Sequence, residues 1–211
     1  MNDCAGTERS GIIPPIQERY DLRALTTFVP NKRIPIHNWF YFKEGFASDF
    51  VKLALAWMKV KQGVVLDPFL GVGTTTLVAK ELGLESIGID VSPLMVLIAR
   101  TKCRNYDIER LKEEAAKMFT KKFSRPDLRQ TPNFIRPYFS KYTLEDVIFF
   151  RNLMKEIKED DIREFLLVAL ISASIQASYV HRDGSLLRAM NKPVPPFRKF
   201  YRAKYYRWIR D

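Results

Sequence analysis

Cysteine and histidine are scarce in this chain of 211 residues, which has two of each. Cys4 and Cys103 are too few for a disulfide framework and lack CxxC spacing, and His37 and His181 cannot assemble a metal cluster by themselves. No apolar run reaches the ~18 residues that span a bilayer, and the polar segment from Met1 to Ser10 is not typical of a signal peptide. These absences predict a cytoplasmic protein with no metal and no membrane partner.

Acidic residues are outnumbered, with 24 Asp and Glu against 35 Lys and Arg, for a net charge of +11. Such a surface gains affinity for nucleic acid by releasing condensed counterions. Positive charge concentrates at 121–129 and in the tail at 197–210, where it alternates with aromatic residues. On a helix, one face of the tail carries four aromatic rings: Phe197, Tyr201, Tyr205 and Trp208. We expect that face to be buried against this chain or a partner, and the alternative is that its rings stack on bases.

The most informative segment is Asp67-Pro68-Phe69-Leu70-Gly71-Val72-Gly73-Thr74-Thr75-Thr76. It lies between a strand-like run at 64–66 and a helix-like run at 77–82, as in a nucleotide-type cofactor loop. The glycines let the backbone turn tightly and approach a ligand, and the threonines can cap the helix. No lysine follows the second glycine and the spacing is not GxGxxG, which argues against ATP and NAD. A second strand at 86–89 ends in Asp90, so the sequence predicts one βαβ unit.

The pattern Asp-Pro-Phe-x-Gly-x-Gly-Thr-Thr resembles the cofactor loop of S-adenosylmethionine-dependent DNA methyltransferases that modify the amino group of adenine or cytosine. This resemblance implies S-adenosylmethionine as cofactor, DNA as partner and a restriction-modification role. It also implies that Asp90 accepts hydrogen bonds from the ribose hydroxyls. The implied cofactor-binding residues are Asp67, Pro68, Phe69, Gly71, Gly73, Thr74, Thr75, Asp90, Val91 and Ser92. The alternatives are an ordinary strand-to-helix turn and, for Asp90, a helix cap.

An aromatic segment at 36–46, followed by an apolar-periodic stretch at 50–58, resembles the part of those enzymes that folds over the methionine end of the cofactor. Aromatic faces suit a sulfonium through cation-π and dispersion contacts. Tyr41 and Phe46 are the candidates here, and the alternative is that both belong to the core.

The base-binding motif of the same family, Asp, Asn or Ser followed by Pro-Pro and an aromatic residue, is absent from this sequence. In that motif the polar residue holds the amino group while the ring stacks on a flipped base. The nearest match, 194–197, has Val194 where an acceptor is required, so a proline-rich connector is the better interpretation. No catalytic residue is predicted.

Only two strands are evident, whereas helical spacing covers 92–104, 108–122, 144–157 and 162–179. The expected fold is α/β, a partial Rossmann-like methyltransferase fold with a mainly helical C-terminal half. We expect an extended segment at 1–30, a cofactor-binding βαβ region at 31–106, and a helical region at 107–211 that includes a polar loop at 181–188 and the basic aromatic tail. Two strands do not make a stable sheet alone.

The leading hypothesis is the S-adenosylmethionine-binding part of a DNA methyltransferase, inactive without a partner. That partner is a second chain carrying the base-binding motif, while a homodimer would cover the open sheet edges without supplying the motif. The alternatives are an RNA or small-molecule methyltransferase, and a non-enzymatic nucleic-acid-binding module with a relic cofactor loop.

Overall fold

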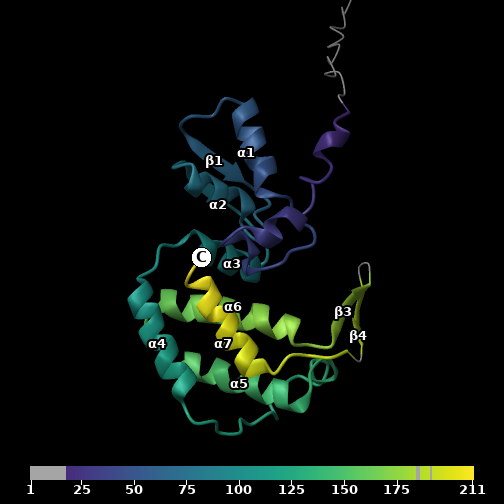
Figure 1. Ribbon diagram of the computed structural model, residues 1–211, viewed down its shortest axis with the longest axis vertical. Helices are drawn as coiled ribbons and strands as arrows, with labels where there is room; N and C mark the ends of the chain where they lie inside the picture. The colour runs from purple at the N-terminus through teal and green to yellow at the C-terminus, as the bar shows by residue number, and fades with distance from the viewer. Residues whose placement is uncertain (1–17, 184–185, 191) are drawn as a thin grey trace, which may run out of the picture.

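The computed structural model describes residues 18–183, 186–190 and 192–211. The first elements are η1 (Tyr20–Leu22), η2 (Val29–Arg33), η3 (His37–Trp39), α1 (Ser48–Trp57), β1 (Val64–Asp67), α2 (Thr74–Glu81), β2 (Glu85–Gly88) and α3 (Pro93–Cys103). They are followed by α4 (Ile108–Thr120), η4 (Arg136–Tyr138), α5 (Lys141–Met154), α6 (Asp160–Gln176), β3 (Val180–Asp183), β4 (Leu186–Ala189) and α7 (Phe197–Trp208). In Figure 1, β1, α1 and α2 lie at one end of the molecule, α4 to α7 at the other, and α3 between them.

The predicted βαβ unit is confirmed. β1 and β2 are parallel neighbours, with Val64 opposite Glu85 and Asp67 opposite Gly88. The connecting helix α2 covers one face of this pair together with α1, and Val65 packs there against a small buried cluster of Val51, Leu55 and Val78. Within the part of the chain that the structure describes, this parallel sheet has two strands.

The main hydrophobic core lies among the helices of the C-terminal half, where α6 is the central element. Its buried positions recur at helical spacing because three neighbouring helices pack around it, α3, α5 and α7. The four helices predicted after the second strand are confirmed as α3, α4, α5 and α6. The molecule is therefore a mixed α/β protein that is mostly helical, with a small parallel sheet.

The aromatic face of α7 is buried against this chain, as one of the two predicted arrangements requires. The Tyr201 hydroxyl donates to the Leu166 carbonyl at 3.0 Å and the Tyr205 hydroxyl to the Leu111 carbonyl at 2.6 Å. Because both polar tips have partners, the rings can be buried at little cost. Lys204 is also buried, and burial lowers its pKa to about 8, so this member of the basic tail does not face solvent.

The N-terminal segment packs against the C-terminal helix α7. The Trp39 and Trp208 rings stack with their centroids 5.0 Å apart, and Trp39 Nε1 donates to Asp211 at 3.1 Å. Phe28 is buried in the same core. The described part of the segment expected to be extended therefore forms the 3₁₀ helix η1 and places Phe28 inside; residues 1–17 lie outside the described residues.

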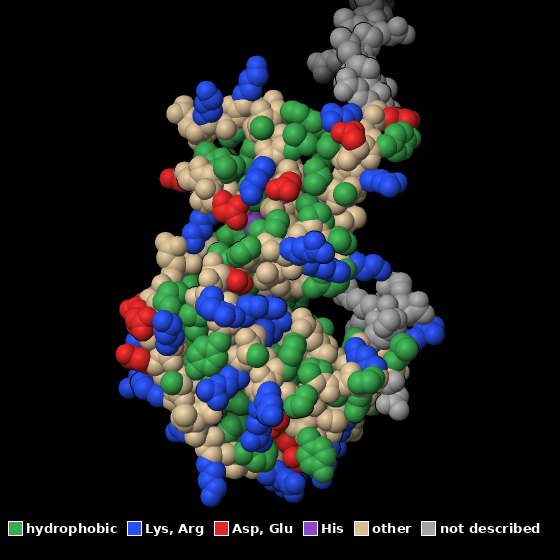
Figure 2. Space-filling model, in the orientation of Figure 1, with side chains coloured by type: hydrophobic (Ala, Val, Ile, Leu, Met, Phe, Trp, Pro, Cys, Tyr) green, Lys and Arg blue, Asp and Glu red, His purple; other side chains and the backbone are tan. Residues whose placement is uncertain are grey.

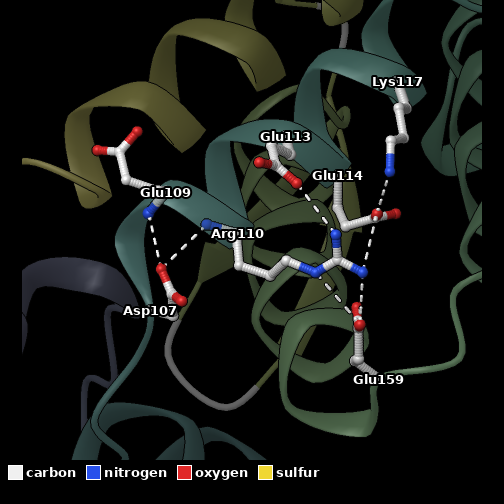
Figure 3. A network of polar contacts seen from close by, with 7 residues as sticks. All are labelled: Asp107, Glu109, Arg110, Glu113, Glu114, Lys117 and Glu159. Carbon is white, nitrogen blue, oxygen red and sulfur yellow. Dashed lines mark hydrogen bonds and ion pairs between the residues drawn. The ribbon is translucent and has the colours of Figure 1, made fainter.

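A polar network joins α4 to the start of α6 (Figure 3). Asp107 caps α4 by accepting from the backbone N–H groups of Glu109 and Arg110. The Arg110 guanidinium donates to Glu159, the N-cap residue of α6, at 2.7 Å, and also pairs with Glu113. These carboxylates hold the pKa of Arg110 above its usual range. Since Arg110 is exposed, the network orients the two helices more than it stabilises them.

The segment 181–188 is not the polar loop expected from its sequence. Its described residues belong to two antiparallel strands, in which β3 pairs with β4 and Val180 lies opposite Ala189. The alternation of polar and apolar residues is too weak there for a strand prediction, because His181, Arg182 and Asp183 are consecutive polar residues and Leu186 and Leu187 are consecutive apolar ones. In the described part of the chain, no helix is both long and apolar enough to cross a membrane.

Candidate functional site

The carboxyl ends of β1 and β2 lie side by side and carry the two predicted acids. Asp67 ends β1, and its Oδ1 accepts from the backbone N–H of Phe69 at 3.0 Å. The pairing continues beyond the strands, since the Leu70 N–H donates to the Ile89 carbonyl at 2.9 Å. The loop after β1 and the turn after β2 therefore form one continuous edge.

Asp90 stabilises this edge by accepting hydrogen bonds with both of its carboxylate oxygens. Oδ2 accepts from the backbone N–H of Gly71 and Oδ1 from the backbone N–H of Ser92, each at 2.8 Å. The bond to Ser92, the N-cap residue of α3, agrees in part with the alternative that Asp90 caps this helix. The bond to Gly71 goes beyond it, because it ties the loop after β1 to the turn after β2.

A different structural feature explains why glycine stands at each position of the loop. Gly71 and Gly73 have φ values of 51° and 80°, a left-handed conformation that other residues adopt at a cost. A Cβ on Gly73 would also lie 2.6 Å from the Ala99 Cβ, so α2 approaches α3 closely only because Gly73 has no side chain. Beyond the loop, a Cβ on Gly88 would lie 2.4 Å from Leu70, a close approach that the sequence did not reveal.

The threonines do not cap α2, contrary to the expectation. The N-cap position is Gly73 and it makes no side-chain capping bond, while Thr74 already belongs to the helix. Thr74 is buried and Thr76 donates to the Gly73 carbonyl at 3.2 Å. The first turn of α2 thus keeps backbone N–H groups that no threonine side chain caps.

Two side chains at this edge, Phe69 and Val91, are almost fully exposed, at 88% and 101% of their accessible surface. Pro68 is exposed beside them, whereas Ser92 and Thr75 are half-buried. Single exposed apolar side chains are common in soluble proteins, whereas contiguous exposed apolar patches mark sites of ligand or partner binding. The edge is open at the surface.

The two predicted aromatic candidates pack against other aromatic rings, and a third ring, Phe42, lies against the loop. Phe46 packs beside Phe50 with ring centroids 5.8 Å apart, against the α1 and α2 cluster. Tyr41 meets Phe28 edge-on at 5.5 Å and lies under the Lys32 ammonium at 4.7 Å. Phe42 lies against the loop, since a Cβ on Gly71 would be 3.3 Å from its ring. The aromatic segment was found from the sequence, but which ring reaches the loop was not.

A cavity of about 550 Å³ lies between the aromatic segment and the helices α3, α5 and α6. Its lining includes Tyr41 and Phe42 from the aromatic segment, Leu94 and Met95 from α3, and Leu167, Leu170 and Ile171 from α6. The cavity is mostly apolar, with Arg151 of α5 at its wall. Phe42 therefore contacts the cofactor loop and lines the cavity as well.

The nearest match to a base-binding motif is a structural connector, as predicted. Pro196 is the N-cap residue of α7 and Phe197 is buried. The Phe197 ring lies 5.8 Å from Tyr201 in a stacked arrangement inside the core. It cannot stack on a base without leaving that core.

Buried polar groups lie behind the loop. His37 is completely buried with Nε2 3.1 Å from Glu81, and Lys102 Nζ donates to the His37 carbonyl at 3.2 Å. Burial lowers the pKa of His37, although Glu81 opposes this, and lowers the pKa of Lys102 to about 7. The described residues contain no cluster of metal-ligating side chains. These groups join η3 to α2 and α3.

The arrangement is that of a nucleotide-type cofactor site in an α/β protein: a glycine loop after the first strand and a fixed carboxylate after the second. Comparison with known proteins supports the resemblance that the sequence shows. Residues 31–101 match the DNA methylase family model. The resemblance to DNA amino-methyltransferases is therefore confirmed, and enzymes of that family use S-adenosylmethionine as methyl donor.

Curated relatives agree with the family model. The chain is 32% identical over 176 residues to the Type II methyltransferase M.BsoBI of Geobacillus stearothermophilus, which covers 79% of this chain and 34% of that protein. It is 40% identical over 113 residues to M.MjaII of Methanocaldococcus jannaschii, covering 49% of this chain and 21% of the relative. It is 28% identical over 175 residues to M.AvaI of Nostoc sp., covering 79% of this chain and 36% of that protein. No solved structure matches.

The matched region spans about a third of the length of the M.BsoBI and M.AvaI methyltransferases. These relatives thus contain a long region for which this chain has no counterpart in the alignment.

Proposed function

We propose that this chain is the S-adenosylmethionine-binding part of a DNA methyltransferase that acts on adenine N6 or cytosine N4. The observation that supports this most is the fixed Asp90 carboxylate at the end of β2. Each carboxylate oxygen has two lone-pair sites, so capacity to accept from two ribose hydroxyls remains after the bonds to Gly71 and Ser92. Val91 and Ser92 would then lie along the adenine.

The other groups at the edge suit the same cofactor. Gly71 and Gly73 leave the backbone accessible, and the N–H groups at the start of α2 favour an anion such as the cofactor carboxylate. Asp67 would hold the cofactor ammonium, with Pro68, Phe69, Thr74 and Thr75 completing the loop. Phe42 offers an aromatic face of the kind that attracts a sulfonium, a role we transfer from Tyr41 and Phe46.

When bound, S-adenosylmethionine supplies an electrophilic methyl group on its sulfonium. The chain itself binds and orients this group, but its sequence has no Asp/Asn/Ser-Pro-Pro-aromatic motif to hold the acceptor amine. Phe197, the one aromatic residue after a Pro-Pro pair, is buried. We therefore expect no methyl transfer to DNA without a second chain that carries the motif, and a homodimer cannot supply it.

DNA as the nucleic acid partner follows from the family and from the charge. Lys and Arg side chains outnumber Asp and Glu over the face shown in Figure 2. On α7, Lys199, Arg202 and Arg207 are exposed. The cluster at 121–129 is a weaker candidate, because Arg125 pairs with Glu145 at 3.2 Å and Lys121 with Glu156 at 3.7 Å.

Calorimetric titration with S-adenosylmethionine tests the cofactor assignment. The unmodified chain should bind, and Asp90→Asn should bind at least about tenfold more weakly because a neutral amide is the poorer acceptor. Asp49→Asn, on the exposed surface of α1, is the matched control and should bind as the unmodified chain does. Equal binding by all three proteins would remove Asp90 from the site. A folded chain that binds DNA with steep salt dependence but never binds the cofactor would support the nucleic-acid-binding module instead.

A further inference from the structure

One face of the β1–β2 pair is open and apolar. Side chains alternate across a strand, so Val65 points toward α1 and α2 while its neighbours point away from them. The outward apolar side chains, which we call the open sheet face, are Val64, Leu66, Ile87 and Ile89, with the exposed Glu85 opposite Val64 at the start of the pair. The four apolar side chains are 55%, 60%, 54% and 55% exposed. Leu66 and Ile87 are direct cross-strand partners, so the four form one continuous patch.

An open face is unusual for a parallel pair. Parallel sheets are almost always covered on both faces, and their strands are accordingly apolar on both sides. The three consecutive residues Val64, Val65 and Leu66 are all apolar, so β1 is apolar on both faces. A two-stranded sheet is also too small to be stable alone. The open sheet face and the two outer strand edges therefore have the properties of a buried interior that lacks its covering layer.

The helical half of the described chain does not provide that layer. The main core forms around α6 and includes none of the four residues of the open sheet face. Figure 1 shows β1 at the end of the molecule opposite α5 and α7. Among the described residues, therefore, no element covers the open sheet face.

The lengths of the relatives indicate what covers this face. M.BsoBI and M.AvaI are about three times as long as the region that aligns with this chain. A second copy fits less well, because a two-fold axis would place the edge strand of one copy antiparallel to its counterpart, whereas the apolar pattern on both faces is that of a parallel strand.

We propose that the open sheet face docks a separate methyltransferase polypeptide that adds parallel strands to the β1–β2 pair and covers Leu66 and Ile87 with an apolar helix. This proposal rests on the proposed function, since it identifies the docking surface for the partner that completes the enzyme.

The test is co-expression of the tagged full chain with the part of the Geobacillus methyltransferase that lies outside the aligned region. The unmodified chain should retain that fragment on purification. Leu66→Lys combined with Ile87→Lys should reduce the retained fragment by at least about tenfold, because two buried charges oppose docking. Tyr142→Lys, at an exposed aromatic position on α5, should retain it fully. Circular dichroism of each variant checks folding.

Hydrogen exchange of the unmodified chain gives an answer that needs no variant. With the fragment bound, backbone amides of 64–67 and 85–89 should gain protection relative to the chain alone. Retention of the fragment by the double variant, protection elsewhere only, failure of the fragment to bind, or self-association through these residues would each overturn the proposal. Cofactor titration of the same preparations distinguishes the two ideas, since a chain that docks the fragment but never binds S-adenosylmethionine contradicts the proposed function alone.

Discussion

At the residue scale, Asp90 combines a structural and a proposed functional role. Its two backbone bonds at 2.8 Å hold Gly71 and Ser92, so the carboxylate is oriented before any ligand arrives. A preoriented acceptor loses less entropy on binding. The sequence predicted Asp90 because an acid at the end of the second strand is a recognisable signal. The bond to Gly71 could not be predicted, because it depends on how two loops meet in space.

Substitution of Gly73 should destabilise the protein more than substitution of Gly83. Both have left-handed φ values, 80° and 72°, so alanine at either position costs about 1 kcal/mol of backbone strain. At Gly73 the new Cβ would also meet Ala99 at 2.6 Å, whereas nothing lies within 4 Å of a Cβ at Gly83. Gly73→Ala should therefore lower the free energy of unfolding by about 1–3 kcal/mol more than Gly83→Ala. Equal losses in urea unfolding would show that α2 and α3 separate freely.

Lys102 should make stability depend on pH. Burial lowers its folded pKa to about 7 from a usual value of 10.5, so between these values the unfolded state binds more protons than the folded state. The free energy of unfolding then rises with pH across this window and falls toward pH 7, by up to about 1.4 kcal/mol per pH unit. Lys102→Met should flatten that slope in urea titrations at several pH values. An unchanged slope would contradict the assignment; Lys204 is present in both proteins and serves as a constant background.

At the element scale, amphipathic helices were the most predictable feature. The aromatic stripe of α7 follows from spacings of three and four residues, and its four rings are buried. What the stripe packs against was not predictable, because the Trp39–Trp208 stack joins residues far apart in sequence. The hairpin of β3 and β4 was missed, since short strands of mixed polarity carry little local signal.

Truncating the buried ring of α7 tests this packing. Trp208→Ala should lower the free energy of unfolding by about 3–5 kcal/mol, because a large cavity would open beside Trp39 and Phe165. Trp57→Ala, at the exposed end of α1, should lower it by less than about 1 kcal/mol. Thermal and denaturant unfolding measure both. Similar losses for the two variants would mean that α7 is not part of the cooperative core.

At the scale of the whole molecule, the large core lies among the helices and meets the proposed site at Val72, a residue of the loop that is buried in that core. The helices around α6 bury most of the large side chains, while the βαβ unit has one small cluster and an open sheet face. The sequence predicted both the glycine loop between β1 and α2 and the shortage of strands, because each depends on local pattern. It could not predict that η3 and α7 share a core, since that contact is determined by tertiary packing.

Equilibrium dialysis with S-adenosylmethionine tritiated in its methyl group, in the presence of DNA, tests the central claim most directly. The purified chain should retain labelled cofactor, and the recovered DNA should carry no label. Label in the DNA would contradict the need for a second chain with the base-binding motif, and a folded chain that retains no cofactor would contradict the assignment of the site.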